Sequence, residues 1–248
     1  MTCPSCNYQG LDPNATFCDQ CGWNFESDEN QQQPILGSVV RPEQTGSAVI
    51  GITVDRTDSS KRFQKGCKKV IEDTFNGFKI NNVSPSIFLF SHGDLDEGQD
   101  TIMHTVNGSP QQVILDFNSI QFGGGGFPKE NHLDAIEHLK NNVPWNPLAH
   151  NAIISIMNDE SKPLRSGKEV ENLGQELKSQ NIKLFLICEI TPILYKLSKS
   201  AGGIMIPISN SPNPDEIQII VQQLTASIQA SLGSGNTVPL NENNPNNL

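Results

Sequence analysis

Short apolar runs alternate with helical patterns through the middle of this chain. The apolar runs predict strands at 48–54, 86–91, 113–117, 151–157, 183–188 and 204–208. Between them, apolar residues recur three and four positions apart, which predicts helices over 61–79, 133–139, 170–177, 193–197 and 217–232. Alternation of this kind, with continuously apolar strands, is typical of a doubly wound, Rossmann-like α/β domain whose mostly parallel sheet is covered by helices on both faces. Ligands of such sheets bind at the carboxyl ends of the strands, so the loops after the strands are the candidate sites.

The two ends of the chain lack this pattern. Residues 26–46 begin with the polar run ESDENQQQP and predict a flexible linker. The last fifteen residues, 234–248, include six asparagines and few apolar side chains, which predicts a disordered tail. We therefore expect a small module at 1–25, the linker, a main domain at 47–233 and the tail.

Composition and charge narrow the classes of partner. The chain has 248 residues, of which 35% are hydrophobic, and 17 basic against 27 acidic side chains give a net charge of −10. This balance disfavours binding to nucleic acid or to an anionic membrane, because both need a basic surface. No apolar stretch is long enough to span a membrane, and the N-terminus shows neither the basic start nor the apolar core of a secretory signal. We expect a cytoplasmic protein.

Four cysteines near the N-terminus have the spacing of a zinc site. Two Cys-x-x-Cys pairs lie close together, and they supply the four sulfur ligands Cys3, Cys6, Cys18 and Cys21. Such a set favours a tetrahedral structural Zn²⁺, with disulfides or a redox pair as the alternative. The two pairs resemble those of the short zinc ribbons at the ends of many bacterial proteins, and that resemblance implies a closed, non-catalytic zinc.

The charge around these cysteines decides what the module could bind. No Lys or Arg precedes Arg41, whereas several acidic residues do. A phosphate backbone would be repelled, so a nucleic-acid adaptor is the less favoured alternative. We expect the aromatic side chains of the module to form its small core or a surface that docks a protein; they are Tyr8, Phe17, Trp23 and Phe25.

A second metal site is predicted where the first strand of the main domain ends. Asp55, Thr57 and Ser59 alternate in the loop directly after the strand at 48–54. Alternate side chains of a loop can converge on one point, and carboxylate and hydroxyl oxygens suit Mg²⁺ or Mn²⁺. The alternative is structural, with Ser59 or Ser60 acting as the N-cap of the following helix.

The arrangement of motifs over about 46–232 resembles a von Willebrand factor A (vWA) domain. Asp55, Thr57 and Ser59 match the D-x-[ST]-x-S motif of the metal-ion-dependent adhesion site (MIDAS) of this family, and Asp159 follows the strand at 151–157, where the family has its later Asp. The usual middle-loop Thr is missing, and Glu130 after the Gly-rich segment 123–126 stands in its place, as in one branch of the family. A departure from that branch is Lys129, which separates Pro128 from Glu130.

This resemblance implies a protein-interaction function. With Mg²⁺ held by Asp55, Thr57, Ser59, Glu130 and Asp159, an open coordination position would accept an acidic side chain of a partner. Glu130 in place of Thr would make the cation less electrophilic and weaken that contact. Members of the family that act inside cells often work with AAA+ ATPases, which makes a component of such a multi-protein system the expected partner. We expect an adaptor of bacterial type rather than an enzyme.

Two enzymatic alternatives are open but less favoured. Ser91, His92 and Gly93 resemble the motif that carries the catalytic His of caspase-like proteases, yet Cys188 lies inside an apolar run and not in a loop. His92 is then expected to be an exposed loop residue, with a place on the metal face as the alternative, and Cys67 and Cys188 to be core residues. A metal-dependent hydrolase would need a general base, for which Asp58, Glu160 and His92 are the candidates.

Overall fold

The computed structural model describes residues 47–80, 84–126 and 129–209, together with residues 213, 215, 218, 219 and 222. The chain divides into two units, and all of these residues belong to the second, Thr45–Leu248. The predicted zinc ribbon, linker and tail therefore lie outside the described residues, and so does most of the helix predicted at 217–232.

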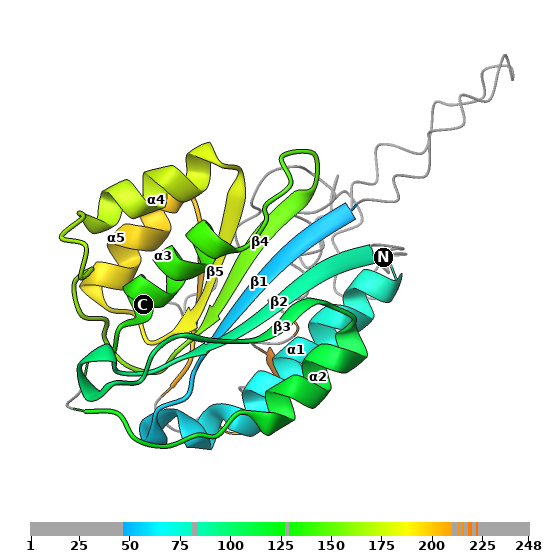
Figure 1. Cartoon of the computed structure of the whole chain (residues 1–248), viewed down its shortest axis with the longest axis horizontal. Helices are drawn as coiled ribbons and strands as arrows, with labels where there is room; N and C mark the ends of the chain where they lie inside the picture. Colours follow the sequence, from blue (N-terminus) through cyan, green and yellow to red (C-terminus); the bar gives the residue numbers. More distant parts are fainter. Residues whose placement is uncertain are drawn as a thin grey trace, which may run out of the picture. The chain divides into compact units, whose positions relative to one another are not determined.

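A six-stranded sheet forms the centre of the main domain, with the strand order β3-β2-β1-β4-β5-β6 (Figure 1). All neighbouring strands pair in parallel except β2 and β3, which are antiparallel. The strands are β1 (Ser47–Asp55), β2 (Ser84–His92), β3 (Ile102–Gly108), β4 (His150–Ile156), β5 (Ile182–Cys188) and β6 (Ile204–Pro207). The predicted α/β class with a mostly parallel sheet is confirmed.

Helices cover both faces of this sheet, as Figure 1 shows. The first face carries α1 (Gln64–Ile80) and α2 (Pro110–Ser119), and the second carries α3 (His132–Asn142), α4 (Val170–Ser179) and α5 (Pro192–Ala201). Two short 3₁₀ segments, η2 (Asp58–Phe63) and η3 (Leu95–Glu97), follow β1 and β2. Because β1, β2, β4 and β5 are parallel, their carboxyl ends and the loops that follow share one edge of the sheet.

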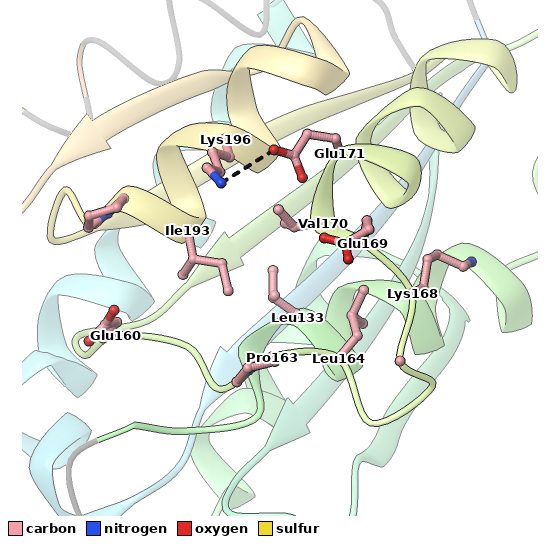
Figure 2. Close-up of a pocket in the computed structure, with 12 residues that line it drawn as sticks. Leu133, Glu160, Pro163, Leu164, Lys168, Glu169, Val170, Glu171, Ile193 and Lys196 are labelled. Carbon is pink, nitrogen blue, oxygen red and sulfur yellow. Dashed lines mark ion pairs between the residues drawn. The ribbon is translucent and has the colours of Figure 1, made fainter.

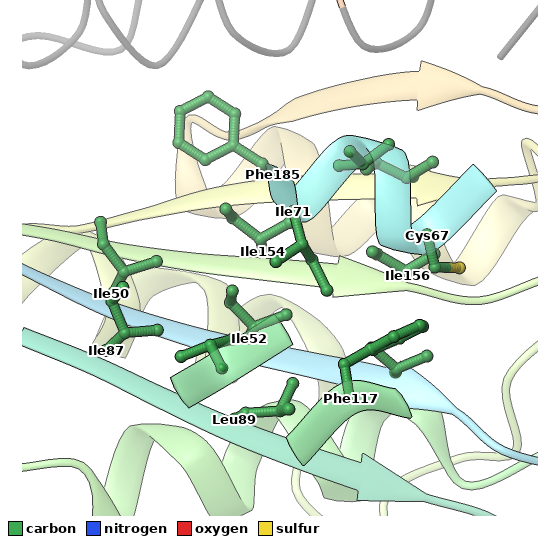
Figure 3. Packing of buried hydrophobic residues seen from close by; sticks show 14 of the residues in the cluster. Ile50, Ile52, Cys67, Ile71, Ile87, Leu89, Phe117, Ile154, Ile156 and Phe185 are labelled. Carbon is green, nitrogen blue, oxygen red and sulfur yellow. The ribbon is translucent and has the colours of Figure 1, made fainter. Parts of the chain in front are cut away.

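Alternating side chains of the strands build two cores. Ile50 and Ile52 of β1 face α1 and α2, where they join Ile71 and Phe117 (Figure 3). Val49 faces the opposite way, into the core under α3, α4 and α5. A sheet buried on both faces explains why the parallel strands are continuously apolar in sequence. The cysteines predicted to be core residues, Cys67 and Cys188, are buried in these two cores.

One predicted strand is wrong, and one strand was not predicted. The apolar run 113–117 lies in the helix α2, where Val113 and Phe117, four residues apart, are both buried. Ser109 caps this helix, because its side chain accepts the N–H of Gln112, and Pro110 occupies the first turn. The unpredicted strand is β3, an edge strand in which only Thr105 is buried, so that it shows no apolar run.

None of the helices in the described ranges combines the length and apolar composition that a membrane-crossing helix requires.

Candidate metal centre

Asp55 ends β1, and its buried carboxylate organises the loop that follows. One carboxylate oxygen, Oδ1, accepts the backbone N–H of Thr57 over 2.9 Å, and the other, Oδ2, accepts the hydroxyl of Ser60 over 2.7 Å. Thr57 Oγ1 in turn lies 3.0 Å from Ser59 Oγ. The loop therefore places the oxygens of its predicted ligands, Asp55, Thr57 and Ser59, in one hydrogen-bonded group. The 3₁₀ segment begins at Asp58 with Thr57 as its N-cap residue, so neither Ser59 nor Ser60 is the cap.

Ser60 connects this loop to the loop after β4. Its hydroxyl, which is buried, lies 2.8 Å from Oδ1 of Asn158 as well as 2.7 Å from Asp55. Asn158 is also buried and directly precedes Asp159, the predicted third carboxylate, which is half-buried. Ser60 and Asn158 were not predicted as site residues, because their contact joins positions 98 apart in the chain.

Glu130, the predicted replacement for the family's Thr, lies in the loop before α3 with only 3% of its surface exposed. A short parallel bridge with Ser161 holds its backbone beside the loop after β4. Within the described part of the chain, its side-chain oxygen Oε2 is buried and has no hydrogen-bond partner. A buried carboxylate oxygen without a donor is costly unless a cation or an unseen donor faces it.

The Gly-rich segment lies between Thr57 and Glu130. A Cβ on Gly125 would lie 3.0 Å from Thr57 Cβ and 3.1 Å from Glu130 Oε1, and the φ of Gly125 is +92°. Its neighbour Gly124 accepts the N–H of Asp58 at 2.9 Å through its backbone carbonyl. The glycine therefore allows the segment to pass close to both side chains, and Thr57 and Glu130 face the same stretch of backbone.

The electrostatics of this edge of the sheet are those of a negatively charged cluster. The pKa of Glu130 is raised from 4.5 to about 7, first by burial and then by the negative charges of Asp55 and Asp94 and, to a lesser degree, of Asp159. Lys162 opposes this effect, because its ammonium group lies 2.5 Å from Asp94 Oδ1. The same ammonium group lies 2.8 Å from Asp96 Oδ2.

These residues fit a hard divalent cation. The available ligand atoms are carboxylate and hydroxyl oxygens, the set that Mg²⁺ prefers, and Glu130 Oε2 has no hydrogen-bond donor among the described residues. Among the residues whose positions are described, however, no three His, Cys, Asp or Glu side chains are close enough to hold an ion by themselves. A cation here would therefore need Thr57, Ser59 or water in addition to the carboxylates, which is how Mg²⁺ is usually bound.

A pair of buried histidines lies beside this cluster and corrects the prediction for His92. His92 ends β2 with 1% of its surface exposed, and its Nε2 lies 2.8 Å from Nδ1 of His132 at the start of α3. Burial and the neighbouring ring lower the pKa of His92 to about 3. The apolar run in sequence stopped one residue short of the polar end of the strand, so His92 was wrongly placed in an exposed loop.

The residues considered for an enzymatic function lie in several different surroundings. Cys188 is fully buried, and its pKa is raised to about 12 by burial and the charge of Glu189, so its thiol is not ionised at neutral pH. Among the candidate general bases, Asp58 is exposed, and Glu160 pairs with Lys129 at 3.0 Å. The third, His92, is hydrogen-bonded to His132.

A pocket of about 390 Å³ opens beside the cluster (Figure 2). Leu133, Val170 and Ile193 line it, which places it between the first turns of α3, α4 and α5. Glu160 also lines it and is the link to the metal centre, because its backbone carbonyl accepts the N–H of Glu130 at 3.1 Å. The edge of the sheet therefore carries a concave, partly apolar surface next to the cluster of carboxylates.

Comparison with known proteins places this fold among vWA domains. No protein-family description and no curated relative matches the sequence. Among solved structures, the SpRpn10 VWA domain is similar with a TM-score of 0.55 and 15% identity, over 72% of this chain and 95% of that one. The hypothetical protein BatB from Bacteroides thetaiotaomicron gives a TM-score of 0.54 and 12% identity, over 75% of this chain and 100% of that one. A third neighbour is proximal thread matrix protein 1 from the mussel byssus. It gives a TM-score of 0.58 and 12% identity, over 74% of this chain and 46% of that one.

At these identities the likeness concerns the fold. The main domain has the vWA fold, a Rossmann-like α/β sheet with helices on both faces. In this fold Asp55 lies at the end of β1, Asp159 in the loop after β4, and Glu130 in the loop before α3.

Proposed function

We propose that this protein is a non-enzymatic interaction module that binds a partner protein through a divalent cation at the carboxyl edge of its sheet. The cation is Mg²⁺ or Mn²⁺, held by Asp55, Glu130 and Asp159 with the hydroxyls of Thr57 and Ser59. An acidic side chain of the partner completes the coordination. As part of the same proposal, the protein acts in the cytoplasm, and its partner is a component of a multi-protein system such as one built around an AAA+ ATPase.

The observation that carries this proposal is the state of Glu130. Its Oε2 is buried with no hydrogen-bond partner among the described residues, and burial together with the neighbouring carboxylates raises its pKa to about 7. A divalent cation would supply the missing partner and relieve the repulsion between the carboxylates, because opposite charge stabilises their ionised form. The hydrogen bonds of Asp55 already hold the first ligand loop in place.

A zinc ribbon completes the proposal at the N-terminus. Cys3, Cys6, Cys18 and Cys21 would bind one structural Zn²⁺, and the free energy of metal binding would fold a module too short for a core of its own. The aromatic and acidic side chains of this module favour a second protein contact over a nucleic acid.

Calorimetric titration of the purified full chain with Mg²⁺ tests the central claim. We expect saturable binding that is lost in Asp55→Ala. Affinity capture from the native host then tests the partner: proteins retained by the wild type in Mg²⁺, and released both by EDTA and by Asp55→Ala, are the metal-dependent partners. Absence of Mg²⁺ and Mn²⁺ binding by a folded wild-type chain would exclude the metal-dependent mechanism.

A further inference from the structure

The two edge strands of the described sheet differ in how they are protected from pairing with a further strand (Figure 1). At one edge, β6 has only four residues and ends in Pro207, and both short length and proline disfavour pairing. At the other edge, β3 has seven residues, and none of them is Pro, Asp, Glu, Lys or Arg. Within the described sheet, the outer side of β3 pairs with no further strand.

The exposed side chains of β3 are mostly apolar. Ile102, Met103 and Val106 are 44%, 51% and 61% exposed. The regular extended backbone is interrupted directly after Val106, because Asn107 has a φ of +49°. The strand therefore offers a short extended edge, from Ile102 to Val106, with three apolar side chains in contact with water.

The distribution of charge favours a second copy of this chain as the occupant of the edge. The chain has a net charge of −10, so two copies repel each other unless they meet at an uncharged surface. Residues 101–115, which include β3, contain no Asp, Glu, Lys or Arg. Their one titratable side chain is His104, which lies 2.7 Å from Ser91 Oγ; burial and the charge of Arg56 lower its pKa, so it is neutral at pH 7. An edge of this kind neither repels a second copy nor attracts a charged partner.

The acidic residue next to β3 favours one orientation of the two strands. Asp100 is exposed and lies two residues before the strand. In a parallel pair the Asp100 side chains of the two copies would lie side by side, whereas in an antiparallel pair they lie at opposite ends. Antiparallel pairing about a two-fold axis also brings Ile102 and Met103 of each copy close to Val106 of the other. Because a two-fold contact uses the same strand of both copies, it closes as a dimer.

We propose that this protein forms a symmetric homodimer through antiparallel pairing of β3, over Ile102 to Val106, with β3 of a second copy. The paired strands satisfy each other's outward N–H and C=O groups and remove the apolar side chains from water. The register of β3 with β2 shifts on both sides of Thr105, which keeps the paired segment short, so the dimer is weak and reversible. The dimer needs no cation, and the carboxyl edges of its two sheets point in opposite directions.

Sedimentation equilibrium of the full chain at rising concentration tests the dimer. We expect the average mass to rise from that of one chain towards twice that value, equally in Mg²⁺ and in EDTA. Val106→Lys and Met103→Lys each place a charge on the paired edge and should keep the protein monomeric over the same range. Leu148→Lys is the matched control, because Leu148 is an exposed apolar residue outside β3, and this variant should dimerise as the wild type does.

Three outcomes would overturn the proposal: a wild type that stays monomeric at near-millimolar concentration, growth beyond twice the mass of one chain, or a dimer that persists in both β3 variants. Isotope-filtered NMR of a mixture of labelled and unlabelled wild-type chains tests the orientation independently of any variant. We expect NOEs between the Met103 methyl group of one copy and the Val106 methyl groups of the other. NOEs between the two Met103 methyl groups in their place would indicate a parallel pair and contradict the proposed dimer.

Discussion

The backbone N–H of Glu130 donates to the carbonyl of Glu160 over 3.1 Å, and the N–H of Lys162 donates back to the carbonyl of Glu130 over 2.8 Å. These two hydrogen bonds fasten the loop before α3 to the loop after β4. Glu130 and Asp159, two of the three proposed carboxylate ligands, therefore lie in loops that these two hydrogen bonds join. A change in one of these loops should therefore shift the other.

Ser60→Ala should destabilise the domain and weaken Mg²⁺ binding. The substitution leaves Oδ2 of the buried Asp55 without its hydroxyl donor, and a loss of this kind lowers the free energy of unfolding by about 1–3 kcal/mol. The matched control is Ser59→Ala. Ser59 is exposed, so its loss should change stability by less than about 0.5 kcal/mol.

Urea denaturation and Mg²⁺ titration of the same two variants separate the roles of the serines. As a proposed ligand, Ser59 should affect Mg²⁺ affinity while leaving stability unchanged. Equal stability of Ser60→Ala and the wild type would contradict the organising role of Ser60.

Gly125→Ala should disturb the metal centre more than Gly167→Ala. Both glycines have positive φ, +92° and +71°, so alanine is strained by about 1–2 kcal/mol at each. A Cβ at 167 meets open space, whereas one at 125 lies within 3.1 Å of Thr57 and Glu130. We expect similar small losses of stability from backbone strain and an additional loss of Mg²⁺ affinity only in Gly125→Ala. Calorimetry shows the difference, and an identical affinity in both variants would refute it.

Glu130 should make a destabilising contribution to the metal-free protein that grows as the pH rises from about 4.5 to about 7, while the buried His92, whose pKa is lowered to about 3, contributes in the opposite direction. The carboxyl of Glu130 has a pKa of about 7 in the folded chain against an ordinary value of 4.5, so the folded state binds the extra proton in this window. Loss of that proton with rising pH costs the folded state on the order of 1–3 kcal/mol.

Urea denaturation at several pH values, in EDTA, measures this slope. Stability should rise more steeply with pH in Glu130→Gln than in the wild type, because glutamine does not titrate. Saturating Mg²⁺ should change the slope in the same direction, since the cation replaces the proton on the carboxylate. A slope unchanged by Glu130→Gln would assign the pH dependence to another group.

The full chain should contain one zinc ion bound by the N-terminal cysteines. Elemental analysis of the purified protein should find about one zinc per chain, and Cys3→Ser should remove most of it, because a tetrahedral site needs all four ligands. Cys67→Ser is the control, since this buried cysteine belongs to the main domain. Zinc retained by Cys3→Ser and lost by Cys67→Ser would refute the assignment.

The parallel part of the fold could be predicted from sequence because its strands are buried on both faces and therefore read as apolar runs. Edge strand β3 could not, since only Thr105 in it is buried. The run at 113–117 was ambiguous by itself, and Ser109 followed by Pro110 was the local signal that indicated a helix.

A site residue could be predicted from the sequence only where its position along the chain indicates where it lies in the fold. Asp55 and Asp159 lie at the carboxyl ends of two parallel strands. These ends share one edge of the sheet, so the topology places the two residues near each other. The topology does not predict the hydrogen-bonding partners around them. Ser60 and Asn158 are 98 positions apart in the chain, and His92 and His132 are 40 apart. Such contacts depend on how two loops and the end of a helix pack together, which the spacing of apolar residues along the chain does not indicate.

The two hydrogen bonds of Asp55 have a thermodynamic consequence for any cation that binds here. Its carboxylate and the backbone of Thr57 already occupy fixed positions, so little conformational entropy remains to be lost at this ligand when an ion arrives. Release of water from the hydrated cation would then dominate the entropy of binding.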